Sequence, residues 1–213
     1  MPQSPGSTSN TPSNPSPDST TEAIMQAVYR ALSKHGYPDL TMAHIASEFD
    51  RSKSLLYYHY DGKEALLNDF FAHICERMEQ DLIDEDEQDP WTRLEGLMDQ
   101  IVNAAMDDEQ LHFRQAFFEI RTQAPHQSSY REQIQRTDDI LLDVLTETIE
   151  LGIETDEFEP VDPEDQAEFI FSSLYGIMFR GVTLEDRDMI ERNRRFLDRQ
   201  LEYTLRKSPK SDH

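Results

Sequence analysis

Residues 41–67 read TMAHIASEFDRSKSLLYYHYDGKEALL, and this stretch decides the fold. Thr41 is a good N-cap for a short helix whose apolar side chains recur at helical spacing. Asp50 tolerates the sharp turn that follows, and a second short helix begins near Ser52. Two short helices joined by a tight turn, with a third helix before them, predict a helix-turn-helix motif at residues 41–60.

Further helices are predicted on both sides of this motif. The segment from Thr20 has apolar side chains on one helical face and predicts an amphipathic helix that ends at Gly36. A fourth, long helix begins near Lys63. The remaining helices are predicted at residues 91–106, 109–123, 127–151, 163–182 and 187–206. The chain is therefore expected to be all-α.

Composition indicates one folded protein outside the membrane. The 213 residues are 37% hydrophobic with 7 glycines, which is sufficient for a core. The most apolar stretch, residues 167–182, is interrupted by serines and Arg180, so no membrane span and no membrane partner are expected. The N-terminus lacks the features of a signal peptide, and Cys75 is the only cysteine. These features favour a reducing cytoplasm as the location.

The net charge of −23 is distributed unevenly along the chain. Residues 1–66 carry 5 Lys and Arg against 7 Asp and Glu, a net charge of −2, and residues 67–213 carry 15 against 36, a net charge of −21. Only the first third is therefore suited to a nucleic-acid partner. The 20 cationic residues comprise 15 Arg and 5 Lys. This composition favours a halophilic protein in a salt-rich cytoplasm, and an ordinary acidic protein is the alternative.

Helix geometry sorts the second short helix into two faces. Leu56 and Tyr60 are four residues apart and are expected to face Ile45 in a small core. The opposite face is then placed to enter the DNA major groove, where hydroxyls and lysine reach phosphates or base edges and an exposed leucine contacts the thymine methyl group. The alternative is that the aromatic side chains only pack the joint between domains, which is the favoured interpretation for Tyr58 and Tyr60.

The stretch resembles the DNA-binding region of the TetR family of transcriptional regulators. That family shows a Thr before its second helix, Ile-Ala within it, then Ser-Lys-Gly-Thr-Leu-Tyr-Tyr-His-Phe and Lys-Glu-Ala-Leu. With ALSKHGY upstream, the resemblance covers about residues 20–67. The matching positions are Thr41, Ile45, Ala46, Ser52, Lys53, Leu56, Tyr57, Tyr58, His59, Lys63, Glu64, Ala65 and Leu66.

Five positions depart from the family pattern, of which Tyr60 in place of Phe is a mild change. Asp50 replaces the usual turn glycine, and Arg51 replaces a small apolar residue, so either local packing differs or a new phosphate contact forms. Ser54 and Leu55 replace Gly and a Thr-like residue, so the operator need not resemble that of a relative. The residues predicted to contact DNA are Thr41, Arg51, Ser52, Lys53, Ser54, Leu55, Tyr57, Tyr58, His59 and Lys63.

The resemblance implies a domain organisation and a function. It implies a ligand-responsive repressor that binds a near-palindromic, double-stranded operator as a homodimer and needs no cofactor. The effector is a small molecule that the sequence does not identify. The expected parts are a disordered tail at 1–18, a helix-turn-helix DNA-binding domain at 19–66, an antiparallel helical bundle for ligand binding and dimerisation at 67–207, and a disordered tail at 208–213.

Two sets of residues in the predicted bundle are candidates for these roles, and ordinary core packing is the alternative for each. The candidates for effector binding are Trp91, Met98, Met106, His112, Phe113, Phe117 and Tyr175, with Arg114 as a further polar anchor. The candidates for the dimer interface are Phe171, Leu174, Met178, Phe196, Leu197 and Leu201. They come from the last two helices, which pair across a two-fold axis in the TetR family.

Two other functions are alternatives to a DNA-binding regulator. Glu109 and His112 match the Glu-x-x-His motif of di-iron bundles, but such sites need a second motif, which the chain lacks. A metal-binding enzyme is therefore disfavoured, and no catalytic site or metal is expected. The other rival is a helical interaction protein that has lost DNA binding. The regulator is favoured because four side chains of types that bind phosphates are present, namely Lys53, Tyr57, His59 and Lys63.

Overall fold

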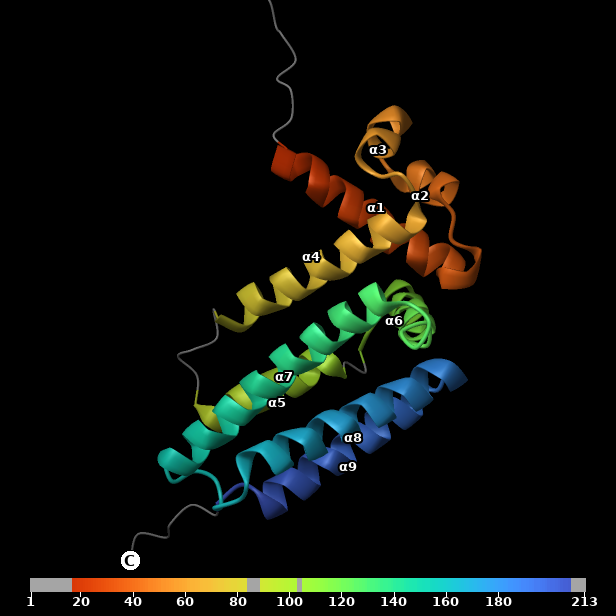
Figure 1. Cartoon of the computed structure of the whole chain (residues 1–213). Helices are drawn as coiled ribbons and strands as arrows, with labels where there is room; N and C mark the ends of the chain where they lie inside the picture. Colours follow the sequence, from red (N-terminus) through yellow and green to blue (C-terminus); the bar gives the residue numbers. More distant parts are fainter. Residues whose placement is uncertain (1–16, 84–88, 103–104, 208–213) are drawn as a thin grey trace, which may run out of the picture.

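The computed structural model describes residues 17–83, 89–102 and 105–207, and these segments are entirely helical apart from turns and one isolated bridge between Phe158 and Arg206 (Figure 1). The tail expected at 208–213 and most of the tail expected at 1–18 lie outside the described residues. The all-α prediction is confirmed. The helices are α1 (Pro17–Asp39), α2 (Met42–Glu48), α3 (Lys53–His59), α4 (Lys63–Ile83), α5 (Pro90–Ile101), α6 (Asp108–Arg121), α7 (Ser128–Glu154), α8 (Pro163–Leu184) and α9 (Arg187–Thr204).

Helices α5, α6 and α8 of the bundle begin at side-chain caps that are visible in the sequence. The Asp107 carboxylate accepts a hydrogen bond from the backbone N–H of Gln110, whose side chain accepts from the backbone N–H of Asp107. Asp89 and Asp162 cap α5 and α8 and are each followed by a proline at the first helical position. Local capping therefore fixes these helix starts within one residue of the predicted positions.

Helix α5 is shorter than predicted. The sequence suggested a helix at 91–106, but α5 ends at Ile101 and the backbone of Val102 is already extended. Val102 and Met106 are both buried in the core without belonging to a helix, which is why their apolar character looked helical in the sequence. Residues 103–104 lie outside the described part of the chain.

Helix α1 is kinked near its C-terminal end. Gly36, the predicted helix end, has φ 65° and ψ 172°, and helical turns resume beyond it to Asp39. The left-handed φ is strained for any residue with a Cβ. The kink frees the backbone N–H of Tyr37, which donates a hydrogen bond to the carboxylate of Glu119 on α6 at 2.9 Å. Because of this bond, α1 is tied to the bundle as well as to α2.

The buried apolar side chains form two clusters. The first contains the inner faces of α1 to α4 together with Ala116 and Ile120 of α6 and Tyr130 and Ile134 of α7. The second fills the space between α5, α6, α7, α8 and α9. Figure 1 shows α8 and α9 lying side by side as the outer layer, with α1 and α4 on the opposite side of α6 and α7. The domain boundary expected at residues 66 and 67 falls inside the continuous helix α4.

Two glycines of α8 differ in their surroundings and allow a paired test of packing. A Cβ on Gly181 would lie 2.0 Å from Cγ1 of the fully buried Ile190, whereas a Cβ on Gly176 would meet no atom within 4 Å. We expect Gly181→Ala to reduce the free energy of unfolding by about 1–3 kcal/mol, because the core is overpacked. Gly176→Ala should raise it by roughly 0.5–1 kcal/mol through helix propensity. Urea denaturation followed by circular dichroism measures both, and equal effects would contradict the packing of α8 on α9.

Candidate nucleic-acid interface and internal cavity

Helices α2 and α3 form the turn unit that the sequence predicts. The Thr41 hydroxyl accepts a hydrogen bond from the backbone N–H of His44 at 3.1 Å and so caps α2. Ile45 and Leu56 are fully buried, and they join α2 and α3 to the core under α1. The prediction that Leu56 faces this core is confirmed. The other side chains of α3, apart from the half-buried Leu55, lie on the outside of the unit.

Most residues predicted to contact DNA lie on this outer face. Tyr57 is 52% exposed and Tyr58 is 84% exposed. The interpretation of Tyr58 as a packing residue is therefore wrong, since it is among the most exposed side chains of the described residues. Tyr60 is half-buried, and burial together with the nearby Asp69 carboxylate raises its pKa to about 12. The other exposed members of the set are Thr41, Ser52, Lys53, Ser54 and His59.

Three members of the predicted set are partly enclosed. Leu55 is half-buried against the first apolar cluster, so less of its side chain is free than the sequence suggested. The Arg51 guanidinium donates a hydrogen bond of 2.6 Å to the Thr20 hydroxyl on α1. Arg51 was expected either to change the local packing or to form a phosphate contact, and the structure shows a contact within the protein. The Lys63 ammonium, at the start of α4, lies 4.8 Å from the centre of the Tyr37 ring.

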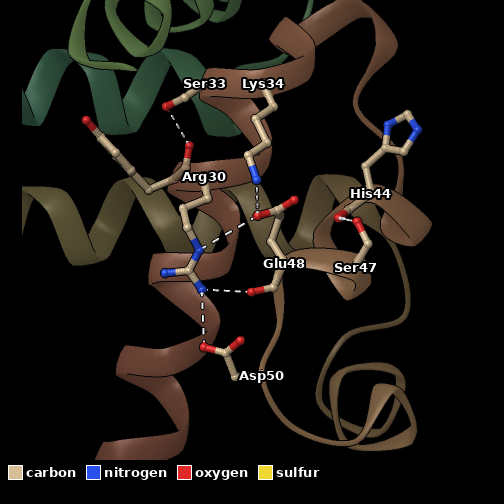
Figure 2. Close-up of polar contacts among 8 residues, drawn as sticks. Arg30, Ser33, Lys34, His44, Ser47, Glu48 and Asp50 are labelled. Atoms are coloured by element: carbon tan, nitrogen blue, oxygen red, sulfur yellow. Dashed lines mark hydrogen bonds and ion pairs between the residues drawn. The ribbon is translucent and has the colours of Figure 1, made fainter. Parts of the chain in front are cut away.

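Helix α1 holds the end of α2 through two cations, as Figure 2 shows. The Arg30 guanidinium donates to the backbone carbonyl of Glu48 at 2.7 Å and lies 3.8 Å from the Asp50 carboxylate in the turn. The Lys34 ammonium lies 2.7 Å from the Glu48 carboxylate. A cation at the C-terminal end of a helix satisfies its free carbonyls and its dipole. These contacts fix the turn that orients α3, and the sequence analysis did not find them because Arg30 is 18 residues from its partner.

A cavity of about 840 Å³ lies between the helix-turn-helix scaffold and the bundle. Helices α1 and α4 line one side of it, and α5 to α8 line the other. Its wall is mainly aromatic and apolar, which suits a small organic ligand. The aromatic lining residues are Tyr29, Phe70, Phe113, Phe117, Phe118 and Tyr175.

Four of the seven predicted effector residues line this cavity, namely Met106, Phe113, Phe117 and Tyr175. The other three lie elsewhere. Trp91 packs edge-on against Phe158 at 6.1 Å, Met98 is fully buried in the second apolar cluster, and His112 is exposed on α6. The predicted effector residues came mainly from the middle helices. Tyr29 of α1 and Phe70 of α4 also line the cavity and were not predicted. The sequence feature that could have indicated Tyr29 is its position at the edge of the apolar face of α1, where a tyrosine is half-buried.

The candidates for the dimer interface divide by exposure. Phe196 is 56% exposed, whereas the other five are buried in the core of the single chain: Phe171, Leu174, Met178, Leu197 and Leu201. The exposed large apolar side chains of α8 and α9 that the sequence analysis did not select are Phe169, Phe179, Leu184 and Tyr203. Helical periodicity alone does not show which of two adjacent apolar residues, such as Phe196 and Leu197, is exposed and which is buried.

The structure also provides information on a metal site and on a membrane span. Glu109 and His112 are both exposed, and no group of three or more His, Cys, Asp and Glu side chains in the described part of the chain is arranged to hold a metal ion. Among the described helices, none combines the length and the hydrophobicity that crossing a bilayer requires.

Comparison with known proteins identifies the family. A sequence model described as bacterial regulatory proteins, tetR family, matches residues 24–70, and a model described as BetI-type transcriptional repressor, C-terminal, matches residues 90–206. The chain is a member of the TetR family. TetR-family proteins are transcription regulators and not enzymes, so the resemblance inferred from residues 41–67 is confirmed and the enzyme alternative is excluded.

Solved structures agree with this assignment. A TetR regulator from Haloarcula marismortui is 32% identical, with a TM-score of 0.79 over 89% of this chain and 100% of that chain. A transcriptional regulator from Saccharomonospora viridis, solved in complex with choline, is 17% identical, with a TM-score of 0.76 over 90% of this chain and 100% of that chain. At that identity the likeness shows the fold alone. A search of curated proteins found no match.

The contacts of Arg30 give a test of how the TetR helix-turn-helix is held. We expect Arg30→Met to lower the free energy of unfolding by about 1 kcal/mol, because the Glu48 carbonyl loses a charged donor. The matched change Lys34→Met removes an ion pair of a lysine that is 57% exposed and should cost less than about 0.5 kcal/mol. Urea denaturation of both variants gives the comparison. A larger loss for Lys34→Met would show that the ion pair, and not the carbonyl contact, holds α2.

Proposed function

We propose that this TetR-family regulator is a ligand-responsive repressor that binds a near-palindromic operator as a homodimer. The observation that carries the proposal is the exposed face of α3. Lys53, Tyr57 and His59 are exposed on this helix, and the buried Leu56 anchors it to the core. Such a helix fits the DNA major groove, and its cationic and hydroxyl groups bind phosphates. Repression is supported by the description of the matching C-terminal model, and a bound dimer blocks polymerase.

The proposed dimer pairs α8 and α9 with the same helices of a second copy. Phe169 of α8 and Phe196 of α9 are both about half exposed, and contact with a second copy would remove their apolar surface from water. A two-fold dimer then places two recognition helices about 34–36 Å apart, or a multiple of that distance, to match successive turns of DNA.

The proposed ligand response depends on the position of the cavity. One side of its wall is formed by α1 and α4, which hold α2 and α3, and the other side is formed by the bundle helices. A ligand that binds more tightly to one arrangement of these two sides shifts the population toward it. The separation of the two recognition helices changes with that arrangement, and the affinity for the operator falls.

A salt-rich cytoplasm is the proposed setting. The net charge of −23 and the excess of Arg over Lys support it, as does the 32% identity to a regulator from Haloarcula marismortui. In such a medium long-range repulsion between the acidic bundle and DNA is screened within a few ångströms. The short-range contacts of α3 then determine binding.

Substitution of Lys53 tests DNA binding directly. We expect Lys53→Ala to weaken binding to all operator sequences by about tenfold, because each protomer loses a charged phosphate contact. The slope of log K against log salt should decrease by about 1 for each protomer. Fluorescence anisotropy with DNA from upstream of the gene provides the measurement. Lys207→Ala, which removes an ion pair with Asp156 away from α3, serves as the control and should leave binding unchanged. A wild-type protein that ignores every promoter fragment would favour the interaction-protein alternative.

Substitution of Phe196 tests the proposed dimer. Phe196→Glu should convert the dimer to monomers in sedimentation equilibrium, because it places two carboxylates at an apolar contact. The exposed position of Phe196 means that the protomer itself should stay folded, as circular dichroism can verify. His112→Glu, at an exposed position on α6, is the control and should leave the dimer intact. A wild-type protein that is monomeric at micromolar concentration would contradict this part of the proposal.

A further inference from the structure

One charged side chain in the wall of the cavity has no counter-ion among the described residues. The Arg114 guanidinium, on α6, donates one hydrogen bond of 2.9 Å to the backbone carbonyl of Gln100 at the end of α5. No carboxylate of the described residues lies within ion-pair distance of it. A guanidinium carries five N–H donors, so most of its donor capacity is left for another group.

The other charged groups of the wall are nearly all engaged. The Glu22 carboxylate lies 3.2 Å from Arg77 and 3.3 Å from the His73 imidazole, and the Asp99 carboxylate lies 3.0 Å from Arg194. Arg30, as shown above, is held by the end of α2. Glu109, the remaining acid, is exposed. Arg114 is therefore the one half-buried charge of this wall that the described residues leave without an opposite charge.

The surroundings of Arg114 make this charge costly. Burial lowers the pKa of Arg114, and the phenol groups of Tyr175 and Tyr29 act in the opposite direction. Arginine stays protonated nonetheless, so a partly desolvated cation remains in the wall of the cavity. Such a cation is stabilised strongly when an anion forms charge-assisted hydrogen bonds with it, and guanidinium groups bind carboxylate and sulfonate-like oxygens in a bidentate manner.

The rest of the wall fits an apolar body attached to that anion. The Tyr29 and Phe113 rings lie 4.5 Å apart, the Phe70 and Phe113 rings 6.1 Å apart, and all three line the cavity. Tyr175 joins them from α8. Aromatic rings alone would also suit a quaternary ammonium group. Such a cation would be repelled by the charge of Arg114, and the carboxylates of Glu22 and Asp99, whose side chains are 41% and 70% exposed, are already paired.

We propose that the effector of this regulator is an amphipathic organic anion, with its acid group bound by Arg114 and its apolar or aromatic body enclosed by the rings of α1, α4, α6 and α8. The identification of this ligand as an effector rests on the proposed function. The binding site itself is a property of the cavity and can be tested without DNA.

Two fluorescent dyes with the same ring system separate the contribution of the anion from that of the apolar wall. 8-Anilinonaphthalene-1-sulfonate carries a sulfonate, and N-phenyl-1-naphthylamine lacks it. The wild-type protein should bind the sulfonate dye more tightly. Arg114→Met should raise the Kd of the sulfonate dye about tenfold or more and leave that of the neutral dye within about twofold. Retained binding of the neutral dye also shows that the variant is folded.

Arg77→Met is the matched control, because Arg77 lines the same cavity but is paired with Glu22. It should change the Kd of either dye by less than about twofold. The proposal is overturned if Arg114→Met leaves the affinity for the sulfonate dye unchanged or weakens both dyes equally. It is also overturned if choline displaces the neutral dye from the wild-type protein, since that result identifies a cation site.

Operator binding is also measured on the same proteins without dye. This measurement distinguishes failure of the proposed anion site from failure of the proposed repressor function. Wild-type protein that binds operator DNA, combined with an unchanged Kd of the sulfonate dye for Arg114→Met, would reject the anion site and leave the repressor function intact. The expected dye result combined with no binding to any promoter fragment would support the anion site and reject the proposed function. Release of operator DNA by the sulfonate dye from wild-type protein, and not from Arg114→Met, supports both.

Discussion

The packing of α1 between two groups of helices is the constraint on which the rest of this structure depends. Its fully buried side chains, such as Ala27 and Val28, belong to a cluster that includes α2 and α4 as well as residues of α6 and α7. Polar contacts reinforce both sides, with Arg30 on the end of α2 and the backbone of Tyr37 on Glu119 of α6. One helix therefore sets the orientation of α3 and also forms part of the cavity wall.

The helix-turn-helix could be predicted from the sequence because its determinants are local. The N-cap at Thr41, the spacing of Ile45 and Leu56 and the turn at Asp50 all act within about 20 residues, and each appears in the structure as the pattern indicated. The interpretation of Tyr58 as a packing residue was wrong, because none of the described helices covers its side chain. Periodicity describes one helix at a time and contains no information about what lies opposite.

The cavity could be predicted only in part for the same reason. Phe113 and Phe117 were predicted because they repeat at helical spacing on α6. Trp91 was predicted on similar grounds, but it packs against Phe158 in the core and does not line the cavity. Whether an apolar side chain meets another side chain or empty space depends on several helices that converge from distant parts of the chain. The significance of Arg114 likewise follows from the partners that its neighbours have already taken, and no sequence pattern records that.

The kink at Gly36 has a consequence for how such a regulator diversifies. The hydrogen bond it permits joins Tyr37 to Glu119 on α6, while the cavity is lined by Phe113, Arg114 and Phe117 of that same helix. The lining residues and Glu119 occupy different positions of α6, so a substitution in the lining does not remove this hydrogen bond. In a ligand-responsive regulator of the kind proposed above, ligand specificity can therefore change during evolution while the connection between α6 and α1 is retained.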